Sequence, residues 1–201
     1  MGKIFCLMGK SSTGKDTIFK LLTEDKELNL IPVVTYTTRP KRKNEENGVN
    51  YFFIDEEKLL SYEKEGKIIE KRQYNTVYGI WYYCTINDGQ IDLEKGDYLI
   101  IATLEAYINL QKCFGKHNVI PFYIEVDDYN RLERAINREK KQECPNYEEV
   151  CRRFLADSAD FSTDKLNAAN IKKYYYNYNL DECVQSIKAD LIMYKKEKQN
   201  E

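Results

Sequence analysis

The chain has few of the residues that build metal centres and histidine-dependent active sites. Among its 201 residues there is one histidine, His117. The six cysteines are scattered, and no two of them form a Cys-x-x-Cys pair. A structural zinc site needs several thiolates or imidazoles at short spacing, so the sequence argues against one. We expect reduced cysteines and a cytoplasmic location.

Long apolar runs and an excess of one charge are also missing. No stretch approaches the about 18 apolar residues of a membrane-spanning helix, and the first apolar run ends at Met8. The formal net charge is −2, from 31 basic and 33 acidic residues. Nucleic-acid-binding domains carry a basic face. We therefore expect no nucleic acid and no membrane as partners, and any phosphate must be bound by local basic clusters.

What the chain does contain is a phosphate-binding loop. Residues 9–15 read Gly-Lys-Ser-Ser-Thr-Gly-Lys, which fits the pattern G-x-x-x-x-G-K. An apolar strand-like run, 3–8, precedes the loop, and residues 16–22 read as the start of a helix. Glycines allow close backbone approach, and N–H groups at a helix N-terminus attract phosphate. The expected nucleotide-binding residues are Gly9, Lys10, Ser11, Ser12, Thr13, Gly14, Lys15, Asp16 and Thr17.

Two residues of this loop carry specific expectations. Lys15 should reach the β- and γ-phosphates as a mobile point charge. Asp16 stands where the pattern has a serine or threonine whose hydroxyl binds Mg²⁺. A carboxylate is also a hard oxygen ligand, so Asp16 is the candidate metal ligand. Thr17 is no simple substitute, because the next residue of a helix points about 100° further round.

Strand and helix signals alternate along the chain, which predicts an α/β fold with a parallel sheet covered by helices on both faces. The expected strands are 33–36, 68–74, 98–102, 119–126 and 173–176. The expected helices are 55–65, 103–113, 127–141, a segment beginning at 147 and a final one around 184–191.

Two segments depart from the alternating order. Residues 37–85 are rich in aromatic and β-branched residues, which predicts a small mixed β lobe. Residues 127–160 are helical and rich in arginine. We therefore expect one domain with three parts: a core (1–36, 86–126 and 161–201), an acceptor-binding lobe (37–85) and a lid (about 127–160).

Arginines form two further clusters. Residues 38–43 are a dense basic stretch that predicts a second anion site, although a solvated charge run is the alternative. Arg131, Arg134 and Arg138 are spaced three and four residues apart, so they share one helix face. Such arginines can neutralise a transferring phosphoryl group. An exposed face laced with glutamates is the alternative.

Glu70 lies in an otherwise apolar and aromatic strand, where a buried carboxylate needs partners. The ring N–H and exocyclic amine of guanine lie side by side and suit one carboxylate that accepts two hydrogen bonds. Adenine cannot satisfy that carboxylate. Tyr51 and Tyr78 are candidates to bind a second phosphate, although tyrosines in a β lobe also serve packing.

Together these residues resemble the guanylate kinase family, and the similarity spans almost the whole chain. The resemblance implies a P-loop kinase fold that uses ATP and Mg²⁺ to phosphorylate GMP. It rests on the phosphate loop, the run 35–39, Arg42, Glu45, Gly48, Tyr51, Phe53, Glu70, Tyr78, Gly79, Arg134, Arg138, Arg153 and Asn177.

The resemblance also implies residue roles. Catalysis would fall to Lys15, Arg39, Arg134, Arg138 and Arg153, the last three as lid arginines. The acceptor phosphate would be held by Arg39, Arg42, Tyr51 and Tyr78, and guanine would be read by Glu70 and Thr35. Asn177 would lie near the adenine of ATP.

Some positions depart from the family pattern. Ile80 stands where the family has a serine or threonine, and residues 101–106 replace Asp-x-Asp-x-Gln-Gly. Thr103 would contact the base in place of an aspartate. Two alternatives therefore stay open. One is a P-loop kinase acting on a related acceptor such as ribose 1,5-bisphosphate, a group that also carries Gly-Lys-Asp in this loop. The other is a guanylate-kinase-like binding module without catalysis. The oligomeric state is not predicted.

Overall fold

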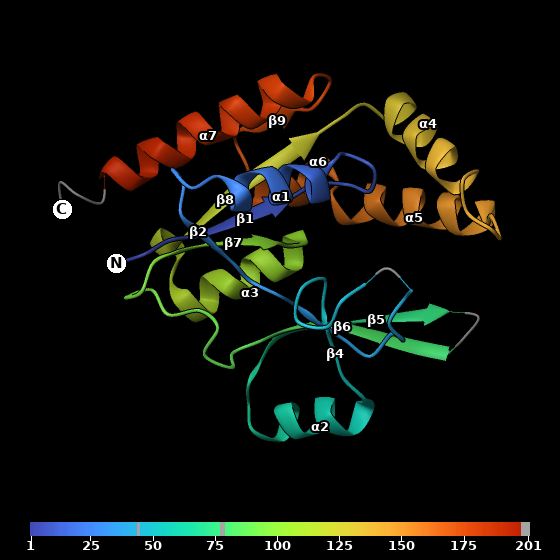
Figure 1. Cartoon of the computed structure of the whole chain (residues 1–201), viewed down its shortest axis with the longest axis horizontal. Helices are drawn as coiled ribbons and strands as arrows, with labels where there is room; N and C mark the ends of the chain where they lie inside the picture. Colours follow the sequence, from blue (N-terminus) through green and yellow to red (C-terminus); the bar gives the residue numbers. More distant parts are fainter. Residues whose placement is uncertain (44, 77–78, 198–201) are drawn as a thin grey trace.

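The main sheet confirms the predicted α/β fold. A computed structural model describes residues 1–43, 45–76 and 79–197 of the chain. Five parallel strands lie in the order β2-β7-β1-β8-β9. Helices cover the sheet above and below in the view of Figure 1. The strands are β1 (Ile4–Met8), β2 (Leu30–Pro32), β7 (Asp97–Ile101), β8 (Val119–Glu125) and β9 (Tyr174–Tyr176).

Both faces of this sheet are buried because successive side chains of the apolar central strand point to opposite sides. Ile4 and Cys6 of β1 belong to one core cluster, whereas Phe5 and Leu7 belong to the other. The first cluster packs against α3 (Leu104–Phe114) and α6 (Thr163–Ala168). The second packs against α1 (Lys15–Glu24) and α7 (Leu180–Glu197).

A smaller, mixed sheet lies below the main sheet in Figure 1 and confirms the predicted β lobe. Its order is β4-β3-β6-β5, with β3 and β4 parallel and the other pairs antiparallel. Helix α2 (Glu56–Lys64) closes it, and Leu59 packs with Tyr36 in a third core cluster. The strands are β3 (Tyr36–Thr37), β4 (Phe52–Phe53), β5 (Ile68–Thr76) and β6 (Gly79–Ile86).

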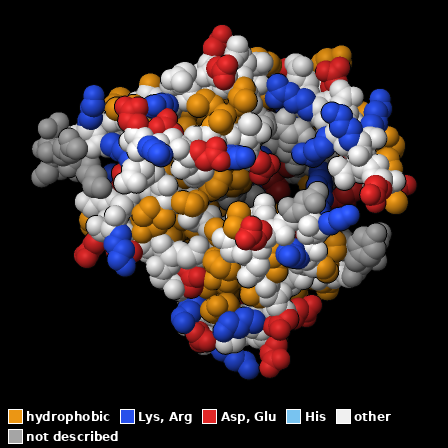
Figure 2. All heavy atoms as spheres, viewed as in Figure 1, with side chains coloured by type: hydrophobic (Ala, Val, Ile, Leu, Met, Phe, Trp, Pro, Cys, Tyr) orange, Lys and Arg blue, Asp and Glu red, His pale blue; other side chains and the backbone are white. Residues whose placement is uncertain are grey.

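Two helices extend beyond one end of the main sheet. Helix α4 (Asp128–Glu139) begins after Asp127, whose carboxylate accepts a hydrogen bond from the N–H of Asn130. Helix α5 (Tyr147–Asp160) runs beside it. We call α4 and α5 the lid helices. Figure 2 shows the surface hollowed between them and the small sheet, with Lys and Arg side chains along the rim on the lid side.

The strand expected at residues 33–36 is wrong. Residues 33–36 do not form a single strand, because the chain passes here from one sheet to the other. The N–H of Val33 still bonds to Leu99 O in the main sheet, whereas the carbonyl of Thr35 accepts from Phe52 N of the small sheet. Pro32, which lacks an N–H, ends β2. Strand β2, helix α6 and the 3₁₀ turn Lys116–Asn118 were not expected from the sequence.

The remaining expected elements are present with ends shifted by a few residues. Among the described residues there is no helix with the length and apolar character needed to span a bilayer.

Candidate functional site

The phosphate-binding loop joins β1 to α1, as expected. Gly9 and Gly14 have φ values of 150° and 91°, a region that side chains rarely adopt. A Cβ atom at Gly9 would lie 2.5 Å from Ile124 O, and one at Gly14 would lie 2.4 Å from Asn177 Nδ2. Both positions therefore require glycine, for backbone conformation and for space.

Two polar side chains of the loop, Ser12 and Lys15, form no hydrogen bond or ion pair with another side chain among the described residues. The Oγ of Ser12 is buried and has no hydrogen-bond partner among the described residues. The Nζ of Lys15 donates to the backbone carbonyl of Lys10, at 2.9 Å. Burial lowers the pKa of Lys15, while the charges of Asp16 and Asp157 oppose this shift. A buried hydroxyl and a desolvated ammonium that share one loop suit an incoming anion.

A cleft of about 210 Å³ brings half of the expected nucleotide-binding residues together with two arginines of α4. Asn177, at the end of β9, donates from Nδ2 to Thr13 O at 2.8 Å, and its own carbonyl accepts from Arg134 Nη2 at 3.0 Å. Asn177 thus connects the phosphate loop, through its side chain, to α4, through its backbone carbonyl. The cleft is lined by Ser12, Gly14, Lys15, Asp16, Thr17, Arg134 and Arg138.

The arginines expected to share the lid have different environments. Arg138 is exposed on the cleft side of α4. Arg131, from the same predicted face, is 1% exposed and packs inside the base of the lid. Arg153 is exposed on α5, where its Nε donates to Glu149 at 2.6 Å. The structure therefore brings Arg134 and Arg138 to the loop, but not Arg153.

The second expected anion site centres on Arg39, which is only 4% exposed. Its guanidinium donates to Tyr83 Oη at 3.1 Å, to Pro40 O at 2.8 Å and to Glu45 at 2.7 Å. Burial raises the pKa of Glu45, but the hydrogen bonds from Arg39 and from the N–H of Arg42 outweigh it, so the net shift is downward. The Arg42 side chain itself is exposed.

Tyr51 links this site to the phosphate loop. Its ring is 5.7 Å from the guanidinium of Arg39 and 5.7 Å from the ring of Tyr83. Burial raises the pKa of Tyr51, and the negative charge of Asp16 is among the further causes. Tyr78, the other tyrosine expected here, lies outside the described residues.

Glu70 is buried in β5, as its surroundings in the sequence suggested, with 4% of its surface exposed. It forms an ion pair with Arg72, and its Oε2 accepts from Thr85 Oγ1 at 3.4 Å. Burial raises the pKa of Glu70, the charge of Arg72 lowers it, and Glu105 adds to the increase. The carboxylate is thus held in place with its charge balanced by one cation.

The two threonines expected to contact the guanine base form different hydrogen bonds. Thr35 is half-buried, and its carbonyl bonds to the N–H of Phe52. The Oγ1 of Thr103 accepts from Ala106 N at 3.3 Å and caps α3. A hydroxyl that accepts here can still donate to a ligand, so the predicted base contact remains a prediction.

Sequence reasoning missed three partners of the site: Arg72, Tyr83 and Asp157. Arg72 could have been found, because residues two apart in a strand share a face and Glu70 needed a cation. Tyr83 and Asp157 could not, since their partners Arg39 and Ser11 lie 44 and 146 residues away in the chain.

No three His, Cys, Asp or Glu side chains gather into a potential metal cluster anywhere in residues 1–43, 45–76 or 79–197. The carboxylate of Asp16 is exposed in the cleft, and it makes no hydrogen bond with the described residues. Mg²⁺ is commonly held by one or two carboxylates together with substrate phosphates and water. Asp16 is compatible with that type of site.

Comparison with known proteins gives one consistent result. Residues 1–161 match the family model described as guanylate kinase. A guanylate kinase of Mycoplasma mobile is 32% identical over 196 residues, which cover 93% of this chain and 90% of the relative. One of Malacoplasma penetrans is 30% identical over 139 residues, covering 69% of this chain and 58% of the relative. The crystal structure of guanylate kinase from Anaplasma phagocytophilum, 23% identical, covers 96% of this chain and 85% of its own with a TM-score of 0.61.

Proposed function

This chain belongs to the guanylate kinase family, and from that premise we propose that it transfers the γ-phosphoryl group of ATP to GMP, giving ADP and GDP. The observation that supports the proposal is the presence of basic residues in both parts of the fold that border one hollow (Figure 2). Lys15, Arg134 and Arg138 line one cleft beside the lid helices, and Arg39 packs with Tyr51 in the small-sheet lobe.

The loop side supports binding of the donor. The cleft is lined by Ser12 and Lys15 and lies at the start of α1, where backbone N–H groups are available. The Oγ of Ser12 has no hydrogen-bond partner among the described residues. Lys15 would exchange the carbonyl of Lys10 for a phosphate oxygen. Asn177 is hydrogen-bonded to the loop, which supports a place for it near the adenine.

The lobe side supports binding of the acceptor phosphate by Arg39, Arg42, Tyr51 and Tyr78. The acceptor is already an anion, so transfer needs no protein base, and catalysis consists mainly of alignment and charge neutralisation. We assign the acceptor lobe to residues 37–85, the lid to about 127–160, and the core to 1–36, 86–126 and 161–201.

The lid side chains would complete the site on closure. Arg134 and Arg138 already line the cleft, and we propose that they neutralise charge on the transferring group. Arg153 does not line the cleft and pairs with Glu149 of its own helix, so we propose that it joins them through movement of α5 and release of that ion pair. Closure also removes water, which limits hydrolysis of ATP. Mg²⁺ bound at Asp16 and the phosphates would neutralise further negative charge.

Base recognition would depend on Glu70. Its carboxyl group can accept two side-by-side hydrogen bonds only while ionised. Burial disfavours that state by raising the pKa of Glu70, and the ion pair with Arg72 opposes this increase. An ionised carboxylate matches the paired donors of guanine. Thr35 and Thr103 would supply further contacts with the base.

The test is ADP release from ATP and Mg²⁺ with GMP, dGMP, AMP, UMP or ribose 1,5-bisphosphate offered separately. We expect turnover with GMP and none with AMP or UMP. Turnover with the sugar phosphate alone would contradict the assignment of Glu70. Absence of turnover with every acceptor, in folded protein that binds ATP, would indicate a binding module.

A further inference from the structure

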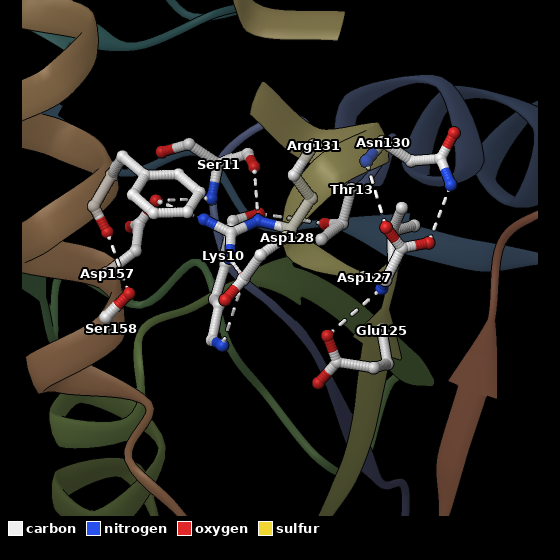
Figure 3. Close-up of polar contacts among 12 residues, drawn as sticks. Lys10, Ser11, Thr13, Glu125, Asp127, Asp128, Asn130, Arg131, Asp157 and Ser158 are labelled. Carbon is white, nitrogen blue, oxygen red and sulfur yellow. Dashed lines mark hydrogen bonds and ion pairs between the residues drawn. The ribbon is translucent and has the colours of Figure 1, made fainter. Parts of the chain in front are cut away.

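The peptide groups of Ser11 are held from both sides by the lid helices (Figure 3). Its N–H donates to Asp157 Oδ2 of α5, at 2.7 Å. Its carbonyl accepts from Arg131 Nε of α4, at 3.2 Å. Ser11 lies in the phosphate loop, directly after Lys10, whose carbonyl binds the ammonium of Lys15. Two different helices therefore fix the backbone next to the atom that holds the catalytic lysine.

The two side chains also hold each other. Arg131 Nη2 lies 3.6 Å from Asp157 Oδ2, and Arg131 Nη1 donates to Asp128 at 2.7 Å. The guanidinium carbon is 4.8 Å from the centre of the Phe154 ring. Arg131 is 1% exposed, whereas Asp128 is mostly exposed. A buried guanidinium with this many contacts keeps one orientation.

We propose that Arg131 and Asp157 are positioning residues that clamp the Ser11 peptide and so shape the phosphate loop for nucleotide binding. The inference rests on the proposed function only in taking an adenine nucleotide as the ligand of the loop. Neither side chain lines the cleft, so we assign their action to the loop backbone. Their charges also act on the pKa of Lys15, in opposite directions: Asp157 raises it and Arg131 lowers it. Breaking the clamp leaves Ser11 free to rotate, and Lys10 O and the loop N–H groups lose their common orientation.

The experiment measures the affinity of each variant for ADP with Mg²⁺, and separately for GMP, by calorimetry. Arg131→Met keeps the length of the side chain and its contact with Phe154, but removes the hydrogen bonds. Asp157→Ala removes the acceptor of the Ser11 N–H. We expect each to raise the Kd for ADP about tenfold and to leave the Kd for GMP unchanged.

A double variant separates positioning from general loss of stability. Because both side chains hold the backbone of one residue, Ser11, Arg131→Met with Asp157→Ala should also weaken ADP binding about tenfold, rather than the hundredfold expected of independent sites. Arg131→Lys should fall between wild type and Arg131→Met. Lys188→Met is the matched control, because Lys188 also bridges two elements, through Asp25 at 2.8 Å and Glu27 at 2.7 Å, but far from the cleft.

Unchanged ADP affinity in both single variants would overturn the proposal, as would equal losses for ADP and GMP. If Arg131→Met does not fold, the ADP affinity of Asp157→Ala decides the proposal, because this variant leaves Arg131 paired with Asp128. The outcome does not depend on turnover. A wild-type protein that fails to phosphorylate GMP would refute the proposed function, while the ADP titrations would still decide the clamp.

Discussion

The two proposed anion sites, the donor side around the phosphate loop and the acceptor side around Arg39, are built in different ways. The donor side is mostly backbone: two glycines with positive φ, a helix N-terminus and a lysine that rests on a carbonyl. The acceptor side is mostly side chain. Its chief arginine, Arg39, is 4% exposed and already donates to three partners, which leaves part of its five N–H donors for a ligand. The donor side is thus held by local geometry, and the acceptor side by packing.

This difference predicts which substitutions reduce activity alone and which reduce both activity and the stability of the fold. A side chain that rests in the donor site without a strong partner can be removed at little structural cost. A side chain at the core of the acceptor site cannot, because its removal leaves a buried partner unpaired. The substitutions below test this contrast, from the largest expected effect to the smallest.

Lys15→Ala should separate function from stability most completely. We expect kcat to fall about 10³-fold, because the charge on the transferring oxygens loses its main cation. The folded state lowers the pKa of Lys15, which means that it disfavours the charged side chain. The melting temperature at neutral pH should therefore not decrease. Steady-state kinetics and thermal unfolding of the same preparation check both statements, and a clear loss of stability would refute the contrast.

Arg39→Met should reduce function and stability together. Its partner Glu45 has only 15% of its side chain exposed, so an unpaired carboxylate would remain buried. We expect a loss of about 3 kcal/mol in unfolding free energy and about a 100-fold fall in kcat/KM for GMP. Urea titrations and initial rates measure these changes. Lys58→Met is the control, because the ammonium of Lys58 lies over the Tyr62 ring in the same lobe and forms no ion pair within the described part of the chain.

The same contrast explains what the sequence could predict. The loop from Gly9 to Lys15 is local, so its motif indicated both its conformation and its neighbours β1 and α1. The main sheet could be predicted from the alternation of strand and helix signals, and the small sheet from the aromatic and β-branched residues of the segment that departs from it. The crossing at residues 33–35 could not, because Thr35 pairs with Phe52 through a contact that no local pattern encodes.

The acceptor side shows the limit more clearly. Glu70 could be selected because a carboxylate in an apolar strand is costly. Its balance of charge could not be predicted in full, since Glu105 approaches from α3, 35 positions further along the chain. The burial of Arg131 shows the same limit. Its spacing from Arg134 and Arg138 predicted only a shared helix face, whereas its burial depends on Ser11 and Asp157, which come from other elements.

Arg72→Gln tests the charge balance of Glu70 through pH. Burial raises the pKa of Glu70 and Arg72 opposes this, so loss of Arg72 should raise the pKa further. A protonated Glu70 cannot accept both hydrogen bonds from guanine. The KM for GMP should therefore increase as the pH falls, and in the variant this increase should begin at higher pH and reach about tenfold relative to wild type.

Two controls make that result specific. The phosphate of GMP itself titrates near pH 6, so the variant is compared with wild type at each pH, where this contribution cancels. Lys71→Gln removes the neighbouring cation, which lies on the other face of β5 and pairs with Glu63 of α2. This variant should leave the dependence of KM on pH unchanged. Discrimination between GMP and IMP, which lacks the exocyclic amine, should also fall in Arg72→Gln. A profile identical to wild type would show that Arg72 is structural.

Asp16→Ser is the smallest expected change, and it tests whether the donor side depends on any side-chain anion. The variant restores the hydroxyl that the loop pattern normally has at this position. The half-saturating Mg²⁺ concentration should rise about fivefold, because one negative charge near the metal is lost. ADP binding without Mg²⁺ should instead strengthen, since the same charge repels phosphate. Asp16→Asn keeps the shape without the charge and should reproduce both shifts if charge is the cause. If all three proteins give identical Mg²⁺ titrations, Asp16 is not a metal ligand, and the donor site is built from backbone and cations alone.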